Sequence, residues 1–141
     1  MKYEDCYKKG LLKKVAVDKG IIDNLLEMAG SDLEEAERSY GSGSHVWASV
    51  QVYAAMLNLA RAVLYSDGIK EKSHYCTVEY IREHYSSHFG DLVNKFDVLR
   101  RERHLTLYDS REHMTAEKAA ERLEWGKQFK TKTDGLLKNR L

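Results

Sequence analysis

Hydrophobic residues recur every three or four positions along most of the chain, which is the spacing of one face of an α-helix. The most apolar stretch runs from Ser44 to Tyr65 and leaves almost no polar face, so it predicts a helix that is buried on most sides. Ser44 stands where an N-cap hydroxyl would lie, and Asp67-Gly68 is a pair that ends helices. As a helix this stretch would be about 33 Å long, the length of a small domain. We therefore predict a central core helix.

A transmembrane span is the alternative for this stretch. Gln51, Asn58 and Arg61 interrupt the apolar run, and an arginine at the centre of a membrane helix costs about 2.5–3.5 kcal/mol on insertion scales. We therefore favour the core helix and expect no membrane contact.

Other segments carry a helical stripe of their own. They run from Asp18 to Tyr40, from Ser73 to Tyr85, from Asp91 to about His104 and from Thr115 to Leu137, and a weaker stripe interrupted by Gly10 covers residues 3–16. Gly41-Ser42-Gly43 provides a short turn after the first of these. The patterns predict a single all-α domain over residues 1–141. Its architecture is an up-and-down bundle of four long helices over 18–139, preceded by a short N-terminal helix within 1–17.

The composition agrees with a helical protein and limits the charge argument. The chain has 141 residues and no proline, with 23 Lys plus Arg against 22 Asp plus Glu. A chain of this length can bury a core without a covalent staple. Because the net charge is near zero, nothing draws the whole molecule to nucleic acid, and any basic site must be local.

Cys6 and Cys76 are the only cysteines and do not form a CxxC pair, so we expect neither a disulfide framework nor a thiolate metal site. Cys76 lies on a helical stripe and is interpreted as a small core residue. The N-terminus lacks the apolar segment of a secretory signal. We therefore expect a reducing compartment, the cytoplasm.

His84 and His88 are four residues apart, a spacing that can hold zinc on a helix. No glutamate follows His84, and Gly90 indicates that the helix is ending. We interpret both as surface histidines and expect no metal and no cofactor.

Basic residues gather at the end of the fourth helical segment, where Arg100, Arg101, Arg103 and His104 surround Glu102. Arginines there could hold a phosphate, and a histidine could move a proton. The alternative is an arginine-rich helix end that is paired with Glu102 and Asp109, and the spacing alone favours this alternative.

The same segment resembles the signature of the HEPN family (higher eukaryotes and prokaryotes nucleotide-binding domain), which is an arginine, four to six residues, then a histidine, often followed by X-Tyr. With Arg101 as the motif arginine, Thr106 occupies the histidine position and Leu107-Tyr108 supplies the X-Tyr. The run from Val52 to Leu64 is similar to the aromatic-alanine second helix of the family, and Ser73-His74 resembles the pair that opens its third. The resemblance covers roughly residues 18–137.

The resemblance implies a helical bundle that dimerises with two copies of the motif at the interface. Many HEPN proteins are metal-independent ribonucleases of toxin–antitoxin systems, and others are non-catalytic partners of small nucleotidyltransferases. Thr106 has no ionisable nitrogen, so it cannot supply the acid–base step that gives typically 10²–10⁴-fold in rate. His104 lies two residues earlier and would point about 200° away on a helix.

We therefore expect a homodimer that binds a nucleotide or RNA phosphate, or docks a nucleotidyltransferase. The residues expected at this site are Arg101, Arg103, His104, Thr106, Tyr108 and Asp109. By the same resemblance, a partner enzyme could nucleotidylate Tyr108. The alternatives are a ribonuclease that uses Arg101 and His104, and a structural homodimer without a ligand.

Overall fold

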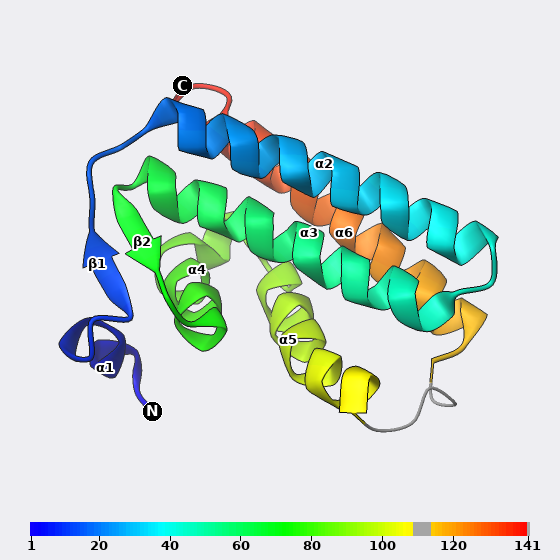
Figure 1. The fold of residues 1–141 in the computed structure, drawn as a ribbon. Helices are drawn as coiled ribbons and strands as arrows, with labels where there is room; N and C mark the ends of the chain where they lie inside the picture. Colours follow the sequence, from blue (N-terminus) through cyan, green and yellow to red (C-terminus); the bar gives the residue numbers. More distant parts are fainter. Residues whose placement is uncertain (109–113, 141) are drawn as a thin grey trace.

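The computed structural model describes residues 1–108 and 114–140, and these residues are mainly helical (Figure 1). The all-α class predicted from the sequence is confirmed, with one very small sheet added. In chain order the elements are α1 (Tyr3–Lys8), β1 (Leu12–Lys14), α2 (Lys19–Gly41), α3 (His45–Ser66), β2 (Ile69–Glu71), α4 (His74–Phe89), α5 (Leu92–Tyr108) and α6 (Ala116–Leu137).

The core is built around α3, as its apolar run predicts. Helices α2, α3 and α6 run side by side, while α4 and α5 pack on another side of α3 (Figure 1). Val52, Met56, Ala60 and Val63 of α3 are fully buried. None of the helices in the described part of the chain is long and apolar enough to cross a membrane.

Helix ends follow the sequence signals with one exception. Asp18, Ser73 and Thr115 each accept a hydrogen bond from a backbone N–H in the first turn of the helix that they precede. Ser44 occupies the N-cap position of α3, but its side chain makes no capping bond. Gly68 adopts the left-handed conformation, with φ of 73°, and so ends α3 where predicted.

Each helical segment predicted after the leading helix appears in the structure, although not all of them are long. Five helices follow α1 in the described residues. Gly90, with φ of 58°, separates α4 from α5, as its position between the two predicted segments indicated. Both are shorter than α2, α3 and α6.

The predicted leading helix over residues 3–16 is wrong beyond Lys8. Gly10 takes a φ of 69°, which ends α1. The chain then forms β1, which pairs antiparallel with β2 with Leu12 opposite Glu71. The segment is too short for a spacing of three to four residues between apolar positions to distinguish a helix from a turn followed by a strand.

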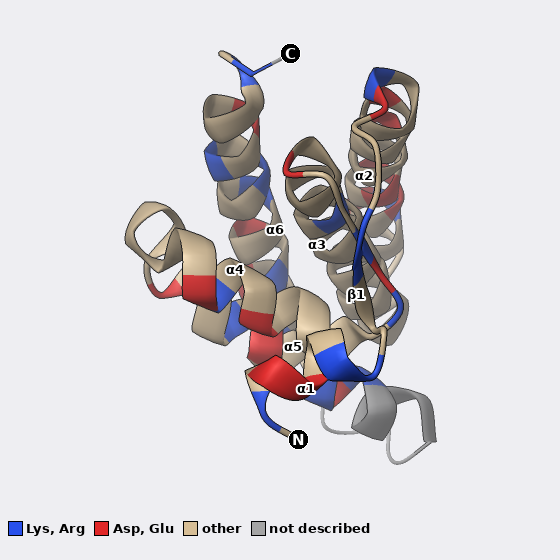
Figure 2. Ribbon diagram, turned by 90° about the vertical axis from the view of Figure 1, so that its left-hand side faces the viewer, with Lys and Arg blue, Asp and Glu red and all other residues tan. Residues whose placement is uncertain are grey.

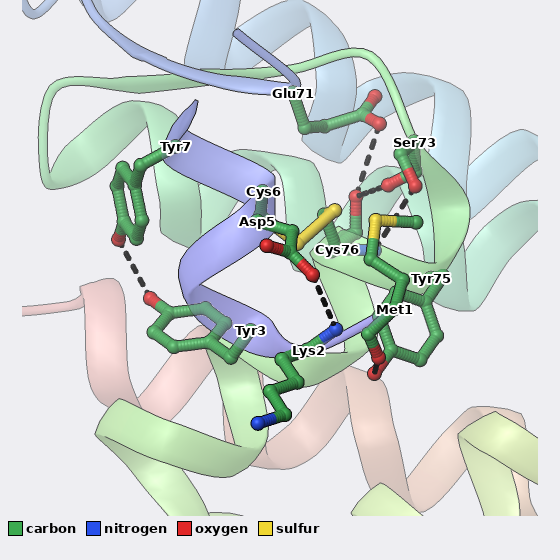
Figure 3. The surroundings of a disulfide bond; sticks show 11 residues. Met1, Lys2, Tyr3, Asp5, Cys6, Tyr7, Glu71, Ser73, Tyr75 and Cys76 are labelled. Atoms are coloured by element: carbon green, nitrogen blue, oxygen red, sulfur yellow. Dashed lines mark hydrogen bonds between the residues drawn. A yellow bond between two sulfur atoms is a disulfide. The ribbon is translucent and has the colours of Figure 1, made fainter. Parts of the chain in front are cut away.

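The expectation that the cysteines stay unpaired is also wrong. Cys6 of α1 and Cys76 of α4 form a disulfide, and both are fully buried (Figure 3). They are 70 residues apart in the chain, but the fold brings their Cα atoms within 5.8 Å, a separation that suits a disulfide. Sequence spacing carries no information about such a contact. The cysteine content therefore gives no argument for a reducing compartment.

Candidate functional site

Polar side chains from four elements meet beside α3, at the start of α4. We call this group the arginine–histidine cluster, and its members are Tyr53 and Arg61 of α3, Glu71 of β2, His74 of α4, and Arg100 and Arg103 of α5. The charges of Arg61, Glu71, Arg100 and Arg103 all act on His74. Segments that are far apart in the sequence thus share one electrostatic environment.

Tyr53 and His74 form the centre of the cluster. The Tyr53 hydroxyl lies 3.0 Å from Nδ1 of His74. Burial raises the pKa of Tyr53 to about 12, although nearby arginines oppose the shift, so the phenol keeps its proton at neutral pH. Burial, assisted by the charge of Arg61, lowers the pKa of His74. We therefore assign the hydroxyl as the donor and Nδ1 of a neutral imidazole as the acceptor.

Arg103 also contacts Tyr53. Its guanidinium carbon is 5.7 Å from the centroid of the Tyr53 ring, within the range of a cation–π contact. Its side chain is exposed, and no carboxylate pairs with it in the part of the chain that the structure describes. As far as the described residues are concerned, its N–H donors are therefore available to a ligand.

Arg61 is the charge that interrupts the apolar run of α3, and the cluster explains its position. Its Nε pairs with a carboxylate oxygen of Glu71, whose other oxygen accepts a 3.0 Å hydrogen bond from the Thr77 hydroxyl. The Glu71 side chain is 6% exposed, whereas that of Arg61 is 30% exposed. Glu71 therefore fixes a guanidinium that still reaches solvent.

Arg100 and Arg101 share a single carboxylate. Asp97 accepts from Nε of Arg100 at 2.9 Å, and its other oxygen lies 3.3 Å from Nε of Arg101. The guanidinium of Arg100 also lies 5.5 Å from the ring centroid of Tyr75. Because one negative charge serves two positive ones, this group of three side chains keeps an excess of positive charge.

Glu102 does not neutralise these arginines. Both of its carboxylate oxygens accept from Arg122 of α6, at 3.1 and 2.7 Å. Glu102 therefore does not pair with the arginines of its own helix, whereas Asp97 pairs with two of them, and Asp109 lies outside the described residues. Figure 2 shows basic and acidic residues interspersed along α2 and α6.

Of the predicted site residues, Arg103 belongs to the cluster, while Arg101 lies beside Asp97 with its side chain 64% exposed. The side chains of His104, Thr106 and Tyr108, and all of Asp109, lie outside the described residues. Their roles, including the replacement of the motif histidine by Thr106, stay predictions.

The predicted site omitted five members of the cluster: Tyr53, Arg61, Glu71, His74 and Arg100. Two signals pointed to them. Arg61 is a lone charge in an apolar helix, and His74 follows a capping serine at the start of another. Neither signal indicates that the two residues meet.

The other histidines considered in the sequence have separate protein partners. Nε2 of His84 lies 3.0 Å from the Tyr3 hydroxyl, and Nε2 of His88 lies 2.7 Å from the carbonyl oxygen of Lys132. Within residues 1–108 and 114–140, no group of three or more His, Cys, Asp and Glu side chains could hold a metal ion.

Comparison with known families agrees with the fold. The family model described as HEPN domain matches residues 22–133, and the chain therefore belongs to the HEPN family. No curated protein shows significant similarity to it. The matched range contains every member of the cluster and excludes α1 and β1.

Proposed function

We propose that the chain binds a phosphate group of a nucleotide or RNA at the arginine–histidine cluster and does not cleave it. The observation that carries this proposal is the state of Arg103, which stacks over Tyr53 without a carboxylate partner among the described residues. A guanidinium that is held in place but not neutralised suits a phosphate, because its planar fork can donate two parallel hydrogen bonds. Membership of the HEPN family supports a nucleotide- or RNA-related function.

The charge balance around His74 supports an anionic ligand. Arg61, Arg100 and Arg103 outnumber Glu71 within the group whose charges act on this imidazole. Side chains of Arg61 and Arg100 are 30% and 25% exposed, so they can reach a ligand and are less screened than fully solvated charges. An anion would reduce the repulsion among the three guanidiniums.

Two residues support binding without cleavage. Thr106 stands at the motif position of the histidine and has no group that ionises near neutral pH. His74 is the histidine at the cluster, but Nδ1 accepts from Tyr53 and its environment disfavours the protonated form that a general acid needs. A ribonuclease that uses Arg101 and His104 is the second candidate.

The wider setting of the proposal follows the family. HEPN domains commonly dimerise, and we propose a cytoplasmic homodimer from a toxin–antitoxin type of system. Docking of a small nucleotidyltransferase, with Tyr108 as the residue that it modifies, belongs to the same proposal. A structural homodimer without a ligand remains its alternative.

The test is RNA binding by the purified chain, followed by fluorescence anisotropy of a short labelled RNA. Arg103→Ala should weaken binding by about tenfold or more, as expected when a charged hydrogen-bonding partner is lost. Arg38→Ala is the control, because Arg38 lies on α2 and pairs only with Glu35 among the described residues. Equal binding by the two variants would contradict the proposed site.

A further inference from the structure

We propose that the Cys6–Cys76 disulfide is a redox switch for the phosphate site. In this inference, which rests on the proposed function, the disulfide holds residues 1–17 against the segment that carries Glu71 and His74, and reduction weakens ligand binding. We call residues 1–17 the N-terminal brace. It comprises α1 and β1, and Figure 2 looks onto this side of the molecule.

The first link between the brace and the site is the disulfide. Cys76 lies in the first turn of α4, two residues after His74. Figure 3 shows α1 lying against the start of α4 with the two sulfur atoms between them. Helix α1 has only six residues, and a helix that short does not persist in water without tertiary contacts. The covalent bond is therefore one of the tertiary contacts that keep α1 in place, together with the hydrogen bond between Tyr3 and His84.

The second link passes through Tyr75. Its hydroxyl donates a 2.9 Å hydrogen bond to the carbonyl oxygen of Met1. The ring of the same tyrosine is the surface over which the guanidinium of Arg100 lies. The position of the first residue of the brace is thus connected, through one side chain, to an arginine of the cluster.

The third link is the small sheet. Backbone N–H of Lys72 donates to the carbonyl oxygen of Leu11 at 2.8 Å, and that of Val15 donates to Gly68 at 2.8 Å. Between these bonds Leu12 lies opposite Glu71, the residue that fixes Arg61. Gly68 is packed so closely that a Cβ there would be 2.9 Å from the carbonyl oxygen of Val15. The backbone of β2 is therefore positioned by β1.

All three links end within residues 68–76, the segment that carries His74 and also Glu71, which fixes Arg61. When the brace is released, this segment loses its hydrogen bonds on one side. A ligand must then order Arg61, which Glu71 no longer holds in place, and His74 as it binds, and the loss of side-chain freedom opposes binding. Immobilising two such side chains corresponds to roughly tenfold weaker binding.

The chemical step is thiol–disulfide exchange with a dithiol reductant. One thiolate of the reductant attacks a sulfur of the Cys6–Cys76 bond, which breaks and leaves a mixed disulfide and one cysteine thiolate. The second thiol of the reductant then displaces the other cysteine. Two electrons and two protons pass to Cys6 and Cys76, and the reductant leaves as a disulfide. Both sulfur atoms are buried, so the brace must first open locally.

The cytoplasm is normally reducing, so in that compartment the Cys6–Cys76 bond would form only when conditions become oxidising. Intracellular disulfides are commonly transient and redox-sensing, so a site that is ordered only in the oxidised form would report the redox state. The brace lies outside the range that matches the HEPN family model. The switch is therefore inferred as a property of this chain and not of the family.

The test compares RNA binding by the oxidised chain with binding by the same sample after reduction with dithiothreitol. Thiol titration should find no free cysteine before reduction and two afterwards. We expect roughly tenfold weaker binding after reduction, and hydrogen exchange in residues 68–76 should become faster. The variant Cys6→Ala, which cannot form the bond, should bind like the reduced chain with and without dithiothreitol.

The outcomes separate the two proposals. Binding by the oxidised chain that reduction leaves unchanged would overturn the switch and leave the proposed function standing. Two free thiols after oxidation in air would also overturn the switch. No RNA binding by either form would overturn the proposed function together with the switch. If Cys6→Ala fails to fold, the reduced wild-type chain still provides the comparison.

Discussion

The ion pair between Glu102 and Arg122 joins the end of α5 to α6 and gives a quantitative test of how the arginine-rich helix end is held. Arg122 has a side chain that is only 8% exposed, and it donates two hydrogen bonds to Glu102. Its guanidinium also lies 4.8 Å from the ring centroid of Trp125 and donates a 2.7 Å bond to Glu121. The variant Glu102→Gln removes the charge and keeps the shape.

The expected magnitude follows from burial. Removing one partner of a buried ion pair costs about 3–5 kcal/mol, since the other charge is left without compensation. Glu102 is 25% exposed on its side chain and Arg122 keeps Glu121, so we expect about 2–3 kcal/mol, somewhat below that range. With an unfolding entropy of about 2.1 cal/mol/K per residue, this corresponds to a fall in Tm of about 7–10 °C.

The control is Glu121→Gln, because Glu121 bonds the same guanidinium from a side chain that is 57% exposed. An exposed partner contributes about 0–1 kcal/mol. Urea unfolding followed by circular dichroism measures both variants. Equal losses of stability in the two variants would refute the reasoning, and so would a loss below about 1 kcal/mol for Glu102→Gln.

Packing, titration and catalysis each provide one further prediction. Gly126→Ala should be less stable than Gly135→Ala by about 1–3 kcal/mol in urea unfolding. A Cβ at Gly126 would lie within about 3 Å of Leu33 and Val52, whereas a Cβ at Gly135 would meet nothing within 4 Å. Similar stabilities of the two variants would contradict the close packing at Gly126. Both glycines lie in α6, so the gain in helix propensity cancels between the variants. Burial lowers the pKa of His74 in the folded chain. As pH falls, His74 is therefore protonated in the unfolded chain at a higher pH than in the folded chain, and this favours unfolding. The contribution of His74 to folding stability is therefore complete above the ordinary histidine pKa of 6.5 and is lost as pH falls below it. In the variant His74→Gln, the urea midpoint should depend less on pH between about pH 7 and pH 5 than in the original chain. An unchanged pH dependence would count against this assignment. Finally, the purified chain should not cleave a mixed RNA in EDTA, because Thr106 cannot transfer a proton; metal-independent cleavage that Arg101→Ala abolishes would favour the ribonuclease.

The sequence was most informative where a pattern extends over many residues. The apolar run of α3 predicts a buried helix because so many of its residues are apolar that most of its surface must be covered. Gly68 and Ser73 mark helix ends through local backbone chemistry. Both signals act within a few residues of the chain. Local periodicity and capping therefore suffice to predict them.

The parts that could not be predicted depend on contacts between distant segments. The disulfide joins residues 70 positions apart, and the pairing of β1 with β2 involves only three residues on each side, too few to show an alternating pattern. The approach of Tyr53 to His74 is equally non-local. A single sequence specifies such contacts only through the packing of the whole bundle, which periodicity does not describe.

The central claim is that Arg61, Arg100 and Arg103 bind a phosphate group together, and NMR of the arginine side chains tests it most directly. The Nε–Hε resonances of the oxidised chain would be followed during titration with a 5′-phosphorylated RNA oligonucleotide, with Arg38 as the internal reference. We predict saturable shifts for the three cluster arginines with one common dissociation constant, and no shift for Arg38. Saturable shifts confined to arginines outside the cluster, or no shift at any arginine, would contradict the account.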